Sequence, residues 1–517
     1  MSSRPRRSKA GPVYVMERVE EMRCIESNAD SLGVSSAVLM ENAGSAIAEA
    51  VARLSRSKGK ILVLCGPGKN GGDGLVTARQ LLRRGCRVTV SLLVPPGSLK
   101  SAEVKSNWEQ YLQLDGPHIH AGQGDWAKRT ELEIRACKMM VDAIYGTGIR
   151  GEIVSDVAKT IDEMNASRKP VVAVDTPSGL EPFSGNVASK AVRATITVTF
   201  HALKRGLVLR RDLAGKIQVA DIGIPESASL FVTTRDIADA LPARGRFTHK
   251  GDYGTVVVVG GSELYSGAPA LAALAALRTG AGLVYIACPE RVATSIRSMS
   301  PDLIVRSLPG DKITQGHVDA LERELGRASV LALGPGLGQA EDSIGGAREI
   351  AQRALEQGKR LVIDADALRI CESLPDGSSP RSVVATPHAG EFRRMAGVEV
   401  GTHWAERVDP VREFANSHRC TVLLKGYHTV ISDGSLVKVN PGGNPGMSKG
   451  GMGDVLTGVL AGLLAQGSAM MVAACGATHI CGEAADLLFT SKGFHYTATD
   501  LVLALPEVLR KHDKYAD

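Results

Sequence analysis

Apolar residues near the start of the chain recur at every third or fourth position, the spacing of one face of a helix. This pattern covers residues 16–54. A continuous apolar run of a different kind follows at 60–65, where leucine and β-branched residues predict a buried strand. A helix at 75–84 and a strand at 87–93 come next. Strand, helix and strand in this order form a βαβ unit, which predicts a parallel sheet.

The same alternation continues along the chain. In the first half, apolar runs predict further strands at 138–144, 170–175, 194–200 and 217–225. In the second half, a helix of small residues is predicted at 268–281, among strands at 255–259, 282–287, 329–333, 360–364, 383–386 and 421–424. Nearly every predicted strand ends in a glycine or polar turn. We therefore expect two α/β sheets, each with its site at the carboxyl ends of its strands.

With 517 residues the chain is too long for one ordinary hydrophobic core. Little sustained periodicity remains at 227–245, so we place a linker there. The expected order is a disordered basic tail at 1–12, a first domain at 13–226, the linker, and a second domain at 246–517.

One apolar stretch, at 455–482, contains no Asp, Glu, Lys or Arg and is long enough to span a bilayer. A polar turn at 466–468 interrupts it, and small residues are frequent. Two buried helices joined by a turn are therefore the favoured interpretation over a membrane span.

Composition narrows the class of protein. A net charge of +6 without a long basic stripe suits small anionic ligands and argues against nucleic-acid binding. The basic residues at 4–9 precede no apolar run, which argues against a signal peptide. The nine cysteines form no C-x-x-C pair, which favours a reducing cytoplasm over zinc or disulfides. We expect a cytoplasmic homo-oligomer without membrane contact.

The strongest single signal is the glycine-rich segment 441–458, P-G-G-N-P-G-M-S-K-G-G-M-G-D-V-L-T-G. A glycine-rich loop that opens a helix presents unpaired N–H groups and the positive end of the helix dipole, which together bind anions. Asp454 in the first turn would repel phosphate. Its simplest task is that of a general base, which deprotonates a hydroxyl that attacks a phosphoryl group. The alternative is a helix-terminal aspartate stabilised by the dipole.

A second glycine-rich segment, 66–74, follows the first predicted strand and contains Asn70 and Asp73. Asp142 and Asp175 end two other strands, and Ser178 follows the second of them. Because the carboxyl ends of parallel strands share one edge, these side chains are expected to converge. Oxygen ligands suit Mg²⁺ or K⁺, or recognition of a ribose. Turn-capping aspartates are the alternative.

Other candidates carry weaker signals. Lys425 follows a predicted strand, where it could neutralise phosphate as a point charge. His388, in T-P-H-A-G-E-F, could contact a second ligand or be a satisfied loop histidine. His118 and His120 form an H-x-H pair without a nearby partner, and we expect them at the surface.

These motifs resemble, in order and over nearly the whole chain, those of the bifunctional NAD(P)H-hydrate repair enzymes. The first half resembles the epimerase domain through L-M-E-N-A-G, G-x-G-x-N-G-G-D-G, V-D-A-x-x-G-T-G, V-D-x-P-S-G-L and D-I-G-I-P. The second half resembles the ADP/ATP-dependent dehydratase through H-K-G-x-x-G, S-G-A-P, G-P-G-L-G, D-A-D-A-L, T-P-H-x-G-E-F, L-L-K-G and G-G-M-G-D-V-L-T-G. The resemblance implies a Rossmann-like three-layer first domain and a ribokinase-like three-layer second domain.

In the epimerase half the resemblance implies two sets of site residues. Asn70, Asp142 and Ser178 would hold a K⁺ ion, and Asp142 is the expected catalytic residue, with Asp175 as the alternative. The hydrate site would be lined by Lys69, Asn70, Gly71, Gly72, Asp73, Gly146, Thr147, Gly148, Ile149, Arg150, Gly151, Glu152 and Asp175.

In the dehydratase half the resemblance implies a substrate site and a nucleotide site, with Asp454 catalytic. The hydrate would contact Ala268, Gly336, His388, Ala389, Gly390, Glu391, Phe392, Arg393, Arg394 and Asp454. The adenine nucleotide would contact Lys425, Gly426, Tyr427, His428, Thr429, Asn444, Pro445, Gly446, Met447, Ser448, Lys449, Gly450, Gly451, Met452 and Gly453. The chain departs from the family at Lys69, Ala389 and Lys449, where Asn, Pro and a small or uncharged residue are usual.

The implied activity is repair of NADH and NADPH hydrated at C6. The first domain would interconvert the R and S epimers. The second would dehydrate the S form at the expense of ADP or ATP, with Mg²⁺. The choice between ADP and ATP, and between NADHX and NADPHX, stays open. Two other functions stay open as well: a ribokinase-like kinase of a small alcohol, and a first half that serves as a binding scaffold.

Overall fold

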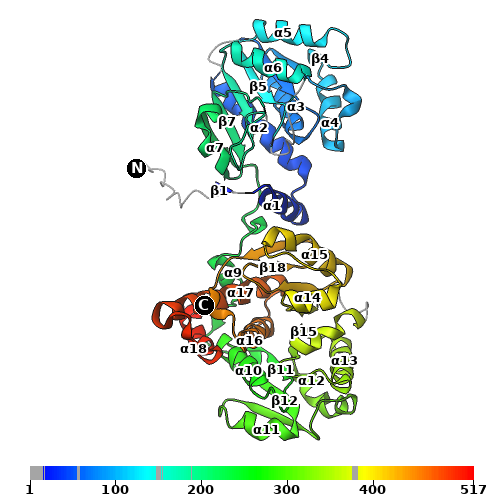
Figure 1. Cartoon of the computed structure of the whole chain (residues 1–517), viewed down its shortest axis with the longest axis vertical. Helices are drawn as coiled ribbons and strands as arrows, with labels where there is room; N and C mark the ends of the chain where they lie inside the picture. Colours follow the sequence, from blue (N-terminus) through cyan, green and yellow to red (C-terminus); the bar gives the residue numbers. More distant parts are fainter. Residues whose placement is uncertain are drawn as a thin grey trace. The chain divides into compact units, whose positions relative to one another are not determined.

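The computed structural model describes residues 15–516 except 17, 55–58, 147–152, 154, 188 and 375–381. The chain divides into two compact units, Met1–Ala228 and Ser229–Asp517 (Figure 1). The predicted basic tail lies outside the described residues. Each unit has its own sheet and its own hydrophobic core, as the length of the chain led us to expect.

The first unit is built on a seven-stranded sheet in the order β4-β3-β2-β5-β6-β7-β9, and every pairing is parallel. The order reverses between β2 and β5, and the crevice at such a switch point is the usual ligand site of a doubly wound sheet. The strands are β2 (Ile61–Cys65), β3 (Val88–Leu92), β4 (His118–His120), β5 (Met139–Ala143), β6 (Val171–Val174), β7 (Ile196–Phe200) and β9 (Lys216–Ala220).

Helices cover both faces of this sheet (Figure 1). Leu62, Leu64 and Met140 pack against Ile134 and Ile161 of two helices on one face. The helices are α1 (Val19–Ser31), α2 (Ser36–Leu54), α3 (Lys69–Arg83), α4 (Ala102–Leu112), α5 (Trp126–Ala136), α6 (Ser155–Ala166), α7 (Arg205–Leu209) and α8 (Arg211–Ala214). A short parallel pair joins β1 (Val15–Met16) to β8 (Leu203–Lys204).

Helix α3 begins at Lys69, six residues before the predicted start at 75. Its glycines explain the difference, because they let the helix start directly behind strand β2. A Cβ on Gly71 would lie 2.0 Å from the carbonyl oxygen of Gly66, and one on Gly74 would lie 2.4 Å from Cβ of Ala143. The segment predicted as a loop is therefore the first turn of a helix packed against the sheet.

The second unit contains a nine-stranded sheet in the order β13-β12-β11-β14-β15-β16-β17-β18-β19. Pairing is parallel up to β17, and the last two strands add an antiparallel edge. The strands are β11 (Thr255–Val259), β12 (Leu283–Pro289), β13 (Ile304–Leu308), β14 (Val330–Leu333), β15 (Arg360–Ile363), β16 (Val383–Ala385), β17 (Thr421–Leu424), β18 (Thr429–Ser432) and β19 (Val437–Asn440). Strands β13, β18 and β19 were not among the predicted ones.

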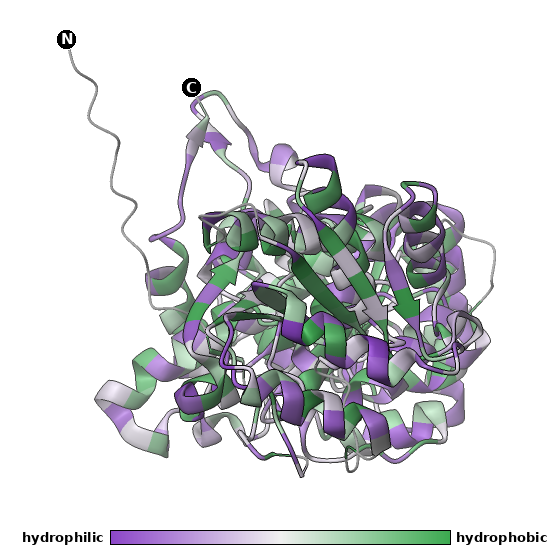
Figure 2. Cartoon of the chain, turned by 90° about the horizontal axis from the view of Figure 1, so that it is seen from above, coloured by the Kyte–Doolittle hydropathy of each residue, from purple (hydrophilic) through white to green (hydrophobic). Residues whose placement is uncertain are grey.

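Helices again flank the sheet. For the chain as a whole, Figure 2 shows helices that carry both apolar and polar residues, and strands that are largely apolar. Longer helices are α9 (Thr234–Ala240), α10 (Gly267–Thr279), α11 (Glu290–Arg297), α13 (Glu341–Glu356), α14 (Ala389–Ala396), α15 (Trp404–Ser417), α16 (Met452–Ala465), α17 (Met470–Lys492) and α18 (Ala498–Leu509). Short helical turns include α12 (Glu322–Arg327), η6 (Ala365–Ser373), η7 (Pro445–Met447) and η8 (Gly493–His495).

The apolar stretch at 455–482 forms the greater part of α16 and α17, joined by a turn, as predicted. Both helices belong to the core of the second unit. Across the described residues, none of the helices has the length and apolar character needed to cross a bilayer.

The segment expected to be a linker, 227–245, is largely part of the second unit. Val232, Ile237 and Ala240 belong to its hydrophobic core, and Phe231 forms a bridge to β19. Strand β10 (Arg244–Gly245) pairs in parallel with β20 (Tyr515–Ala516) near the end of the chain. The sequence pattern missed this because α9 is too short to show sustained periodicity.

Close packing of α10 against α16 fixes the start of α16. Gly458 makes this approach possible, because a Cβ there would lie 2.1 Å from the carbonyl oxygen of Ala272 and 2.7 Å from Cβ of Ala275. Neither helix can move away without opening the core that both share.

We therefore expect Gly458→Ala to destabilise the second unit by about 1–3 kcal/mol, since overpacking outweighs the gain in helix propensity. Calorimetric unfolding of the full chain measures the effect. The matched control is Gly326→Ala in α12, where the added Cβ meets no atom within 4 Å. An unchanged or raised unfolding temperature for the Gly458 variant would contradict this packing argument.

Candidate active sites

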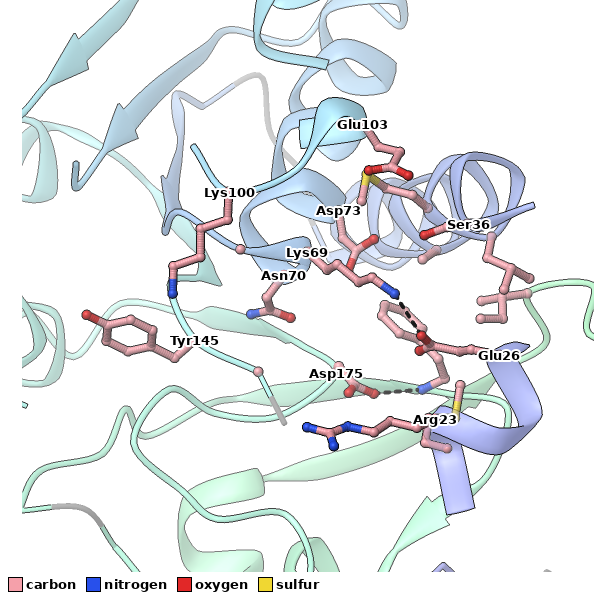
Figure 3. A pocket seen from close by; sticks show the side chains of 18 of the residues that line it. Arg23, Glu26, Ser36, Lys69, Asn70, Asp73, Lys100, Glu103, Tyr145 and Asp175 are labelled. Atoms are coloured by element: carbon pink, nitrogen blue, oxygen red, sulfur yellow. Dashed lines mark hydrogen bonds and ion pairs between the residues drawn. The ribbon is translucent and has the colours of Figure 1, made fainter. Parts of the chain in front are cut away.

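The first unit contains a cavity of about 1110 Å³ at the switch point of its sheet (Figure 3). Helix α1, the first two turns of α3 and the segments that follow β5 and β6 line it. Of the predicted hydrate-site residues, the structure brings Lys69, Asn70, Asp73, Gly146 and Asp175 to its wall. Gly71 and Gly72 are buried in α3 and do not line it. The predicted residues 147–152 lie outside the described part of the chain.

Asp175 is held as a carboxylate at the end of β6. Its Oδ1 accepts hydrogen bonds from Thr199 Oγ1 and Phe200 N, each at 3.1 Å, and forms an ion pair with Lys204 (Figure 3). The Lys204 side chain is only 1% exposed. Asp175 has a φ of 61°, a left-handed conformation that costs free energy for a non-glycine residue and is common at functional sites.

Asp73 lies in the second turn of α3 and faces the same cavity (Figure 3). Burial raises the pKa of its carboxyl well above the usual value, and the charges of Asp175 and Glu26 raise it further. Lys69 opposes this rise, but its ammonium is paired with Glu26 at 2.8 Å. The cavity therefore combines a carboxylate held by a lysine with a second carboxyl group that favours its protonated form.

Asp142 is fully buried at the end of β5 and does not line the cavity. Its Oδ1 accepts from Ser178 Oγ at 2.5 Å and its Oδ2 from Ser178 N at 2.8 Å. Burial raises the pKa of Asp142 to about 6, although the Ser178 hydrogen bonds oppose the rise. The sequence correctly expected these two residues to converge.

Asn70 lies close to this pair. Its Oδ1 would be 3.0 Å from a Cβ at Gly146, and the neighbouring Tyr145 N donates to Ser178 Oγ at 2.8 Å. Asn70 Nδ2 is buried and has no hydrogen-bond partner in the described part of the chain. If the amide nitrogen and oxygen of Asn70 exchanged places, the oxygen would take the position of Nδ2. Asn70, Asp142 and Ser178 would then offer oxygen ligands of the kind that suits a hard cation. The described residues contain no cluster of three or more His, Cys, Asp and Glu side chains that could hold a metal ion.

The second unit brings Asp454 to a buried ion pair. Lys425 Nζ donates to Asp364 Oδ1 at 2.8 Å and lies 3.8 Å from Glu391 Oε2. Thr457, one turn beyond Asp454 in α16, donates to Asp364 Oδ2 at 2.7 Å. The start of α16 therefore lies directly above the carboxyl ends of β15 and β17, where the sequence predicted the site.

The carboxyl groups of Asp364, Glu391 and Asp454 outnumber the single ammonium group of Lys425, and this difference affects which of them are protonated. Burial alone would raise the pKa of Asp364, but the charge and hydrogen bond of Lys425 outweigh it and leave the pKa below its usual value. Burial likewise would lower the pKa of Lys425, yet Asp364 and Glu391 raise it above its usual value. Asp454 lacks a hydrogen bond of this kind among the described residues. Burial, with the charge of Asp364, raises its pKa to about 7.

Gly451 caps the N-terminus of α16 with a φ of 88°, and no side chain caps the first turn. The N–H groups of that turn and the helix dipole give partial positive charge beside Asp454, where the sequence predicts an anion site. A Cβ on Gly453 would lie 3.4 Å from Lys425 Nζ. The predicted phosphate cation thus lies next to the helix terminus.

Of the predicted nucleotide residues 425–429, the first four form the turn between β17 and β18, and Thr429 begins β18. Arg407 of α15 holds this turn in place. Its guanidinium donates to the carbonyl oxygens of His428 at 2.5 Å and Lys425 at 2.7 Å. Tyr427 is 75% exposed at the tip of this turn. Arg407 is buried, and burial lowers its pKa to about 10. Arg407 could not be predicted from the sequence, because it lies in a helix outside every motif.

The other predicted nucleotide residues, 444–453, are anchored from the C-terminal helices. Asn444 Oδ1 accepts from the buried Tyr496 hydroxyl at 2.8 Å, and its Nδ2 donates to Asp486 at 2.8 Å. Lys449 Nζ donates to the carbonyl oxygens of Phe494 and Tyr496. Lys449 therefore fastens the loop to η8, and its contact with the adenine nucleotide stays a prediction.

Of the predicted substrate residues of this unit, His388 and Glu391 lie beside the Asp364–Lys425 pair. His388 caps α14, where its Nδ1 accepts from Gly390 N at 3.0 Å, and its backbone pairs with that of Lys425. Glu391 and Arg394 line a second cavity of about 480 Å³ together with Asp366 of η6. Ala268 lies in the first turn of α10. Gly336 is close to it, because a Cβ added to Gly336 would lie 3.2 Å from Cβ of Ala268, and Gly336 has a φ of 65°. Ala389, Phe392 and Arg393 belong to α14.

Comparison with known proteins assigns both units. Residues 36–206 match the family described as YjeF-related protein N-terminus, and residues 256–507 match the NAD(P)H-hydrate dehydratase family. The chain is 43% identical to a bifunctional NAD(P)H-hydrate repair enzyme of Pyrobaculum aerophilum over 95% of this chain and 97% of that one. It is 39% identical to that of Methanothermobacter thermautotrophicus over 96% and 95% of the two chains.

A solved structure of a hypothetical protein from Streptococcus mutans is similar to this chain in fold. It has a TM-score of 0.50 at 24% identity and covers 55% of this chain and 100% of its own. The expected fold class is confirmed: both units are three-layer α/β structures, the first Rossmann-like and the second ribokinase-like.

The raised pKa of Asp454 makes a prediction about stability. The unfolded carboxyl titrates near pH 4 and the folded one near 7, so folding binds a proton and stability falls as the pH rises between these values. Asp454→Asn should therefore raise stability above pH 7 by about 1–3 kcal/mol and leave it unchanged below pH 4.

Thermal unfolding of the second unit over this pH range measures the difference. The control is Asp513→Asn, which replaces an exposed aspartate near the C-terminus. A variant at position 454 that is equally or less stable at pH 8 would mean that its ionised carboxylate is better solvated than this geometry implies.

Proposed function

The chain belongs to the family of bifunctional NAD(P)H-hydrate repair enzymes, and on this premise we propose a reaction for each unit. The first unit epimerises the R and S forms of NADHX and NADPHX. The second dehydrates the S form to NAD(P)H, with ADP converted to AMP and phosphate, or with ATP. The observation that carries the second reaction is Asp454, a half-buried carboxyl beside an uncapped helix N-terminus and a buried lysine.

In the dehydratase, Asp454 removes the proton of the C6 hydroxyl as its oxygen attacks the terminal phosphoryl group of the nucleotide. The N–H groups at the start of α16 and the Lys425 ammonium stabilise the negative charge that the phosphoryl group carries. The new phosphate ester then leaves from C6 with its electron pair, and loss of a proton from C5 restores the ring double bond. Mg²⁺ bound to the nucleotide supplies further positive charge.

The adenine nucleotide binds between the turn at 425–429 and the loop at 444–453. Arg407 holds the first of these and Lys449 the second, so both are ordered before the nucleotide arrives. The hydrated nicotinamide binds on the other side of Asp454, against Ala268, Gly336 and the start of α14. This places the C6 hydroxyl between the carboxyl group and the phosphoryl group.

In the epimerase, C6 carries both a hydroxyl and the ring nitrogen, so the ring can open to an aldehyde and close on the opposite face. Opening needs a base for the hydroxyl proton and an acid for the ring atom that the C6–N bond leaves. Asp175 and Asp73 are the carboxyl groups that line the cavity, and we assign these two proton transfers to them. Asp142, Asn70 and Ser178 would hold K⁺, which supplies a fixed positive charge beside the ring.

We also propose that the protein acts in the cytoplasm as a homo-oligomer and without nucleic acid. All nine cysteines are free, and eight are buried, which supports a reducing compartment.

The direct test is recovery of the near-ultraviolet absorbance of reduced nicotinamide from a mixture of R and S NADHX with K⁺, Mg²⁺ and either ADP or ATP. Full recovery with phosphate release supports both activities and identifies the nucleotide. Recovery that stops near half would remove the epimerase assignment. No recovery with either nucleotide would favour a small-alcohol kinase instead.

Asp454→Asn is expected to slow dehydration by about 10²–10⁴-fold, because it removes the base. In the unaltered protein, kcat/KM should rise about tenfold per pH unit below pH 7 and level off above it, as Asp454 loses its proton. Epimerisation in the same variant should stay unchanged, which is the internal control. Near-normal dehydration in the variant would exclude Asp454 as the base.

Asp73→Asn is expected to slow epimerisation by about 10²-fold or more while dehydration of pure S hydrate continues at the normal rate. An amide cannot donate or accept the proton that a carboxyl group exchanges. Chromatographic separation of R and S NADHX over time gives the epimerisation rate. The comparison variant is Glu103→Gln, another carboxylate of the cavity lining, which we expect to retain activity. Equal rates for the Asp73 variant and the unaltered protein would exclude the proposed acid.

A further inference from the structure

Two cationic side chains line the first-unit cavity and have no partner among the described residues. Arg23 projects from α1 and Lys100 from the segment after η1 (Pro96–Ser98), and both extend into the pocket in Figure 3. Within the described ranges, neither side chain has a hydrogen bond or ion pair. The other two cations of the lining differ in this respect, because Lys69 is paired with Glu26 and Lys204 with Asp175.

A backbone hydrogen bond to the glycine-rich segment 66–74 holds Lys100 in position. Its backbone N donates to the carbonyl oxygen of Pro67 at 3.0 Å, directly before the start of α3. Gly68 is the N-cap of α3, no side chain caps it, and its first turn contains no acidic residue. The positive end of a 15-residue helix and the Lys100 ammonium therefore lie at the same end of the cavity.

Lys100 also follows β3, the second strand of the βαβ unit. In doubly wound sheets the segment after this strand reads the ribose of a bound dinucleotide, with an acid for a free 2′-hydroxyl or a cation for a 2′-phosphate. Residues 93–102 contain no Asp or Glu. The first acid after them is Glu103, which also lines the cavity, so Lys100 is the residue of this segment that suits a phosphate group.

The carboxyl groups of the cavity leave room for such an anion. Of the five carboxyl groups in the lining, Lys69 and Lys204 neutralise those of Glu26 and Asp175, and burial favours the protonated form of Asp73. Asp30 and Glu103 have no ion pair with a described residue, and neither is paired with Arg23 or Lys100. The cavity volume of about 1110 Å³ also exceeds the ~300–1,000 Å³ typical of sites for small molecules. A ligand that extends from Asp73 and Asp175 to Arg23 and Lys100 is therefore larger than the nicotinamide ring alone.

We propose that Arg23 and Lys100 bind the phosphate groups of the hydrated dinucleotide and so position its damaged ring at Asp73 and Asp175. This rests on the epimerase function proposed for the first unit. NADHX offers only its diphosphate to these cations, whereas NADPHX also offers a 2′-phosphate. The two side chains are binding residues, so their loss should weaken substrate binding and leave the proton transfers intact.

The experiment compares Arg23→Met, Lys100→Met and the double variant with the unaltered full chain. Epimerisation of R-NADHX and of R-NADPHX is followed by chromatography without adenine nucleotide, so that dehydration does not occur. We expect each single variant to raise KM about tenfold, with kcat within about twofold, because each loses a charge-assisted contact to phosphate. The matched control is Lys105→Met, an exposed lysine of α4 that does not line the cavity.

Two results support the proposal and identify the group bound. Equal increases of KM for both substrates assign the cations to the diphosphate. An increase confined to NADPHX assigns them to the 2′-phosphate and makes them determinants of specificity. An unchanged KM in the double variant, or the same increase in the Lys105 control, would overturn the proposal.

A binding measurement separates this inference from the epimerase assignment itself. If the unaltered protein does not epimerise either hydrate, the proposed function of the first unit fails. Calorimetric titration with 2′-phospho-ADP-ribose, which lacks the nicotinamide ring, still tests the phosphate site. Loss of affinity in the double variant would support the site on its own, and equal affinity would overturn it.

Discussion

Each unit of this protein places more carboxyl groups at the edge of its sheet than it has ammonium groups to pair with them. In the second unit, Lys425 is hydrogen-bonded to Asp364, and Asp454 lies nearby without a share in that bond. In the first unit, Lys204 is paired with Asp175, and Asp73 is the carboxyl left over. Because burying an unpaired charge is costly, the remaining carboxyl keeps its proton to a higher pH.

Because each site has too few lysines to pair with all of its carboxyl groups, these carboxyl groups have two different roles. The carboxylate bonded to the lysine is fixed in position and anionic, so it orders the site. The other carboxyl keeps its proton to a higher pH, and in the second unit its pKa of about 7 allows the proton exchange that acid–base catalysis requires. The arrangement also opposes stability, because the folded state must tolerate a carboxyl that ionises with difficulty.

The sequence was informative where chemistry and backbone geometry coincide in a short segment. Asp142 with Ser178, and Asp454 with the glycine-rich loop, could be placed because strand ends of a parallel sheet share one edge. Lys204 and Arg407 could not, since each acts across the fold from a segment without a motif. The start of α3 was placed too late because glycine suggests a loop, whereas here it permits close helix packing. The role of Lys449 also depended on contacts with residues nearly fifty positions away.

The second unit depends on residues near the end of the chain, because Lys449 donates hydrogen bonds to Phe494 and Tyr496, and β10 pairs with β20. These contacts limit the order in which the unit can form during synthesis. Its nucleotide loop is fastened to residues made after the rest of the sheet, and its first strand pairs with residues 515–516. A nascent chain that has emerged only as far as α17 contains every strand of the nine-stranded sheet but lacks the residues that fasten this loop and pair with β10. The seven-stranded sheet of the first unit is complete by residue 220, so this sheet can form while the second unit is still being translated.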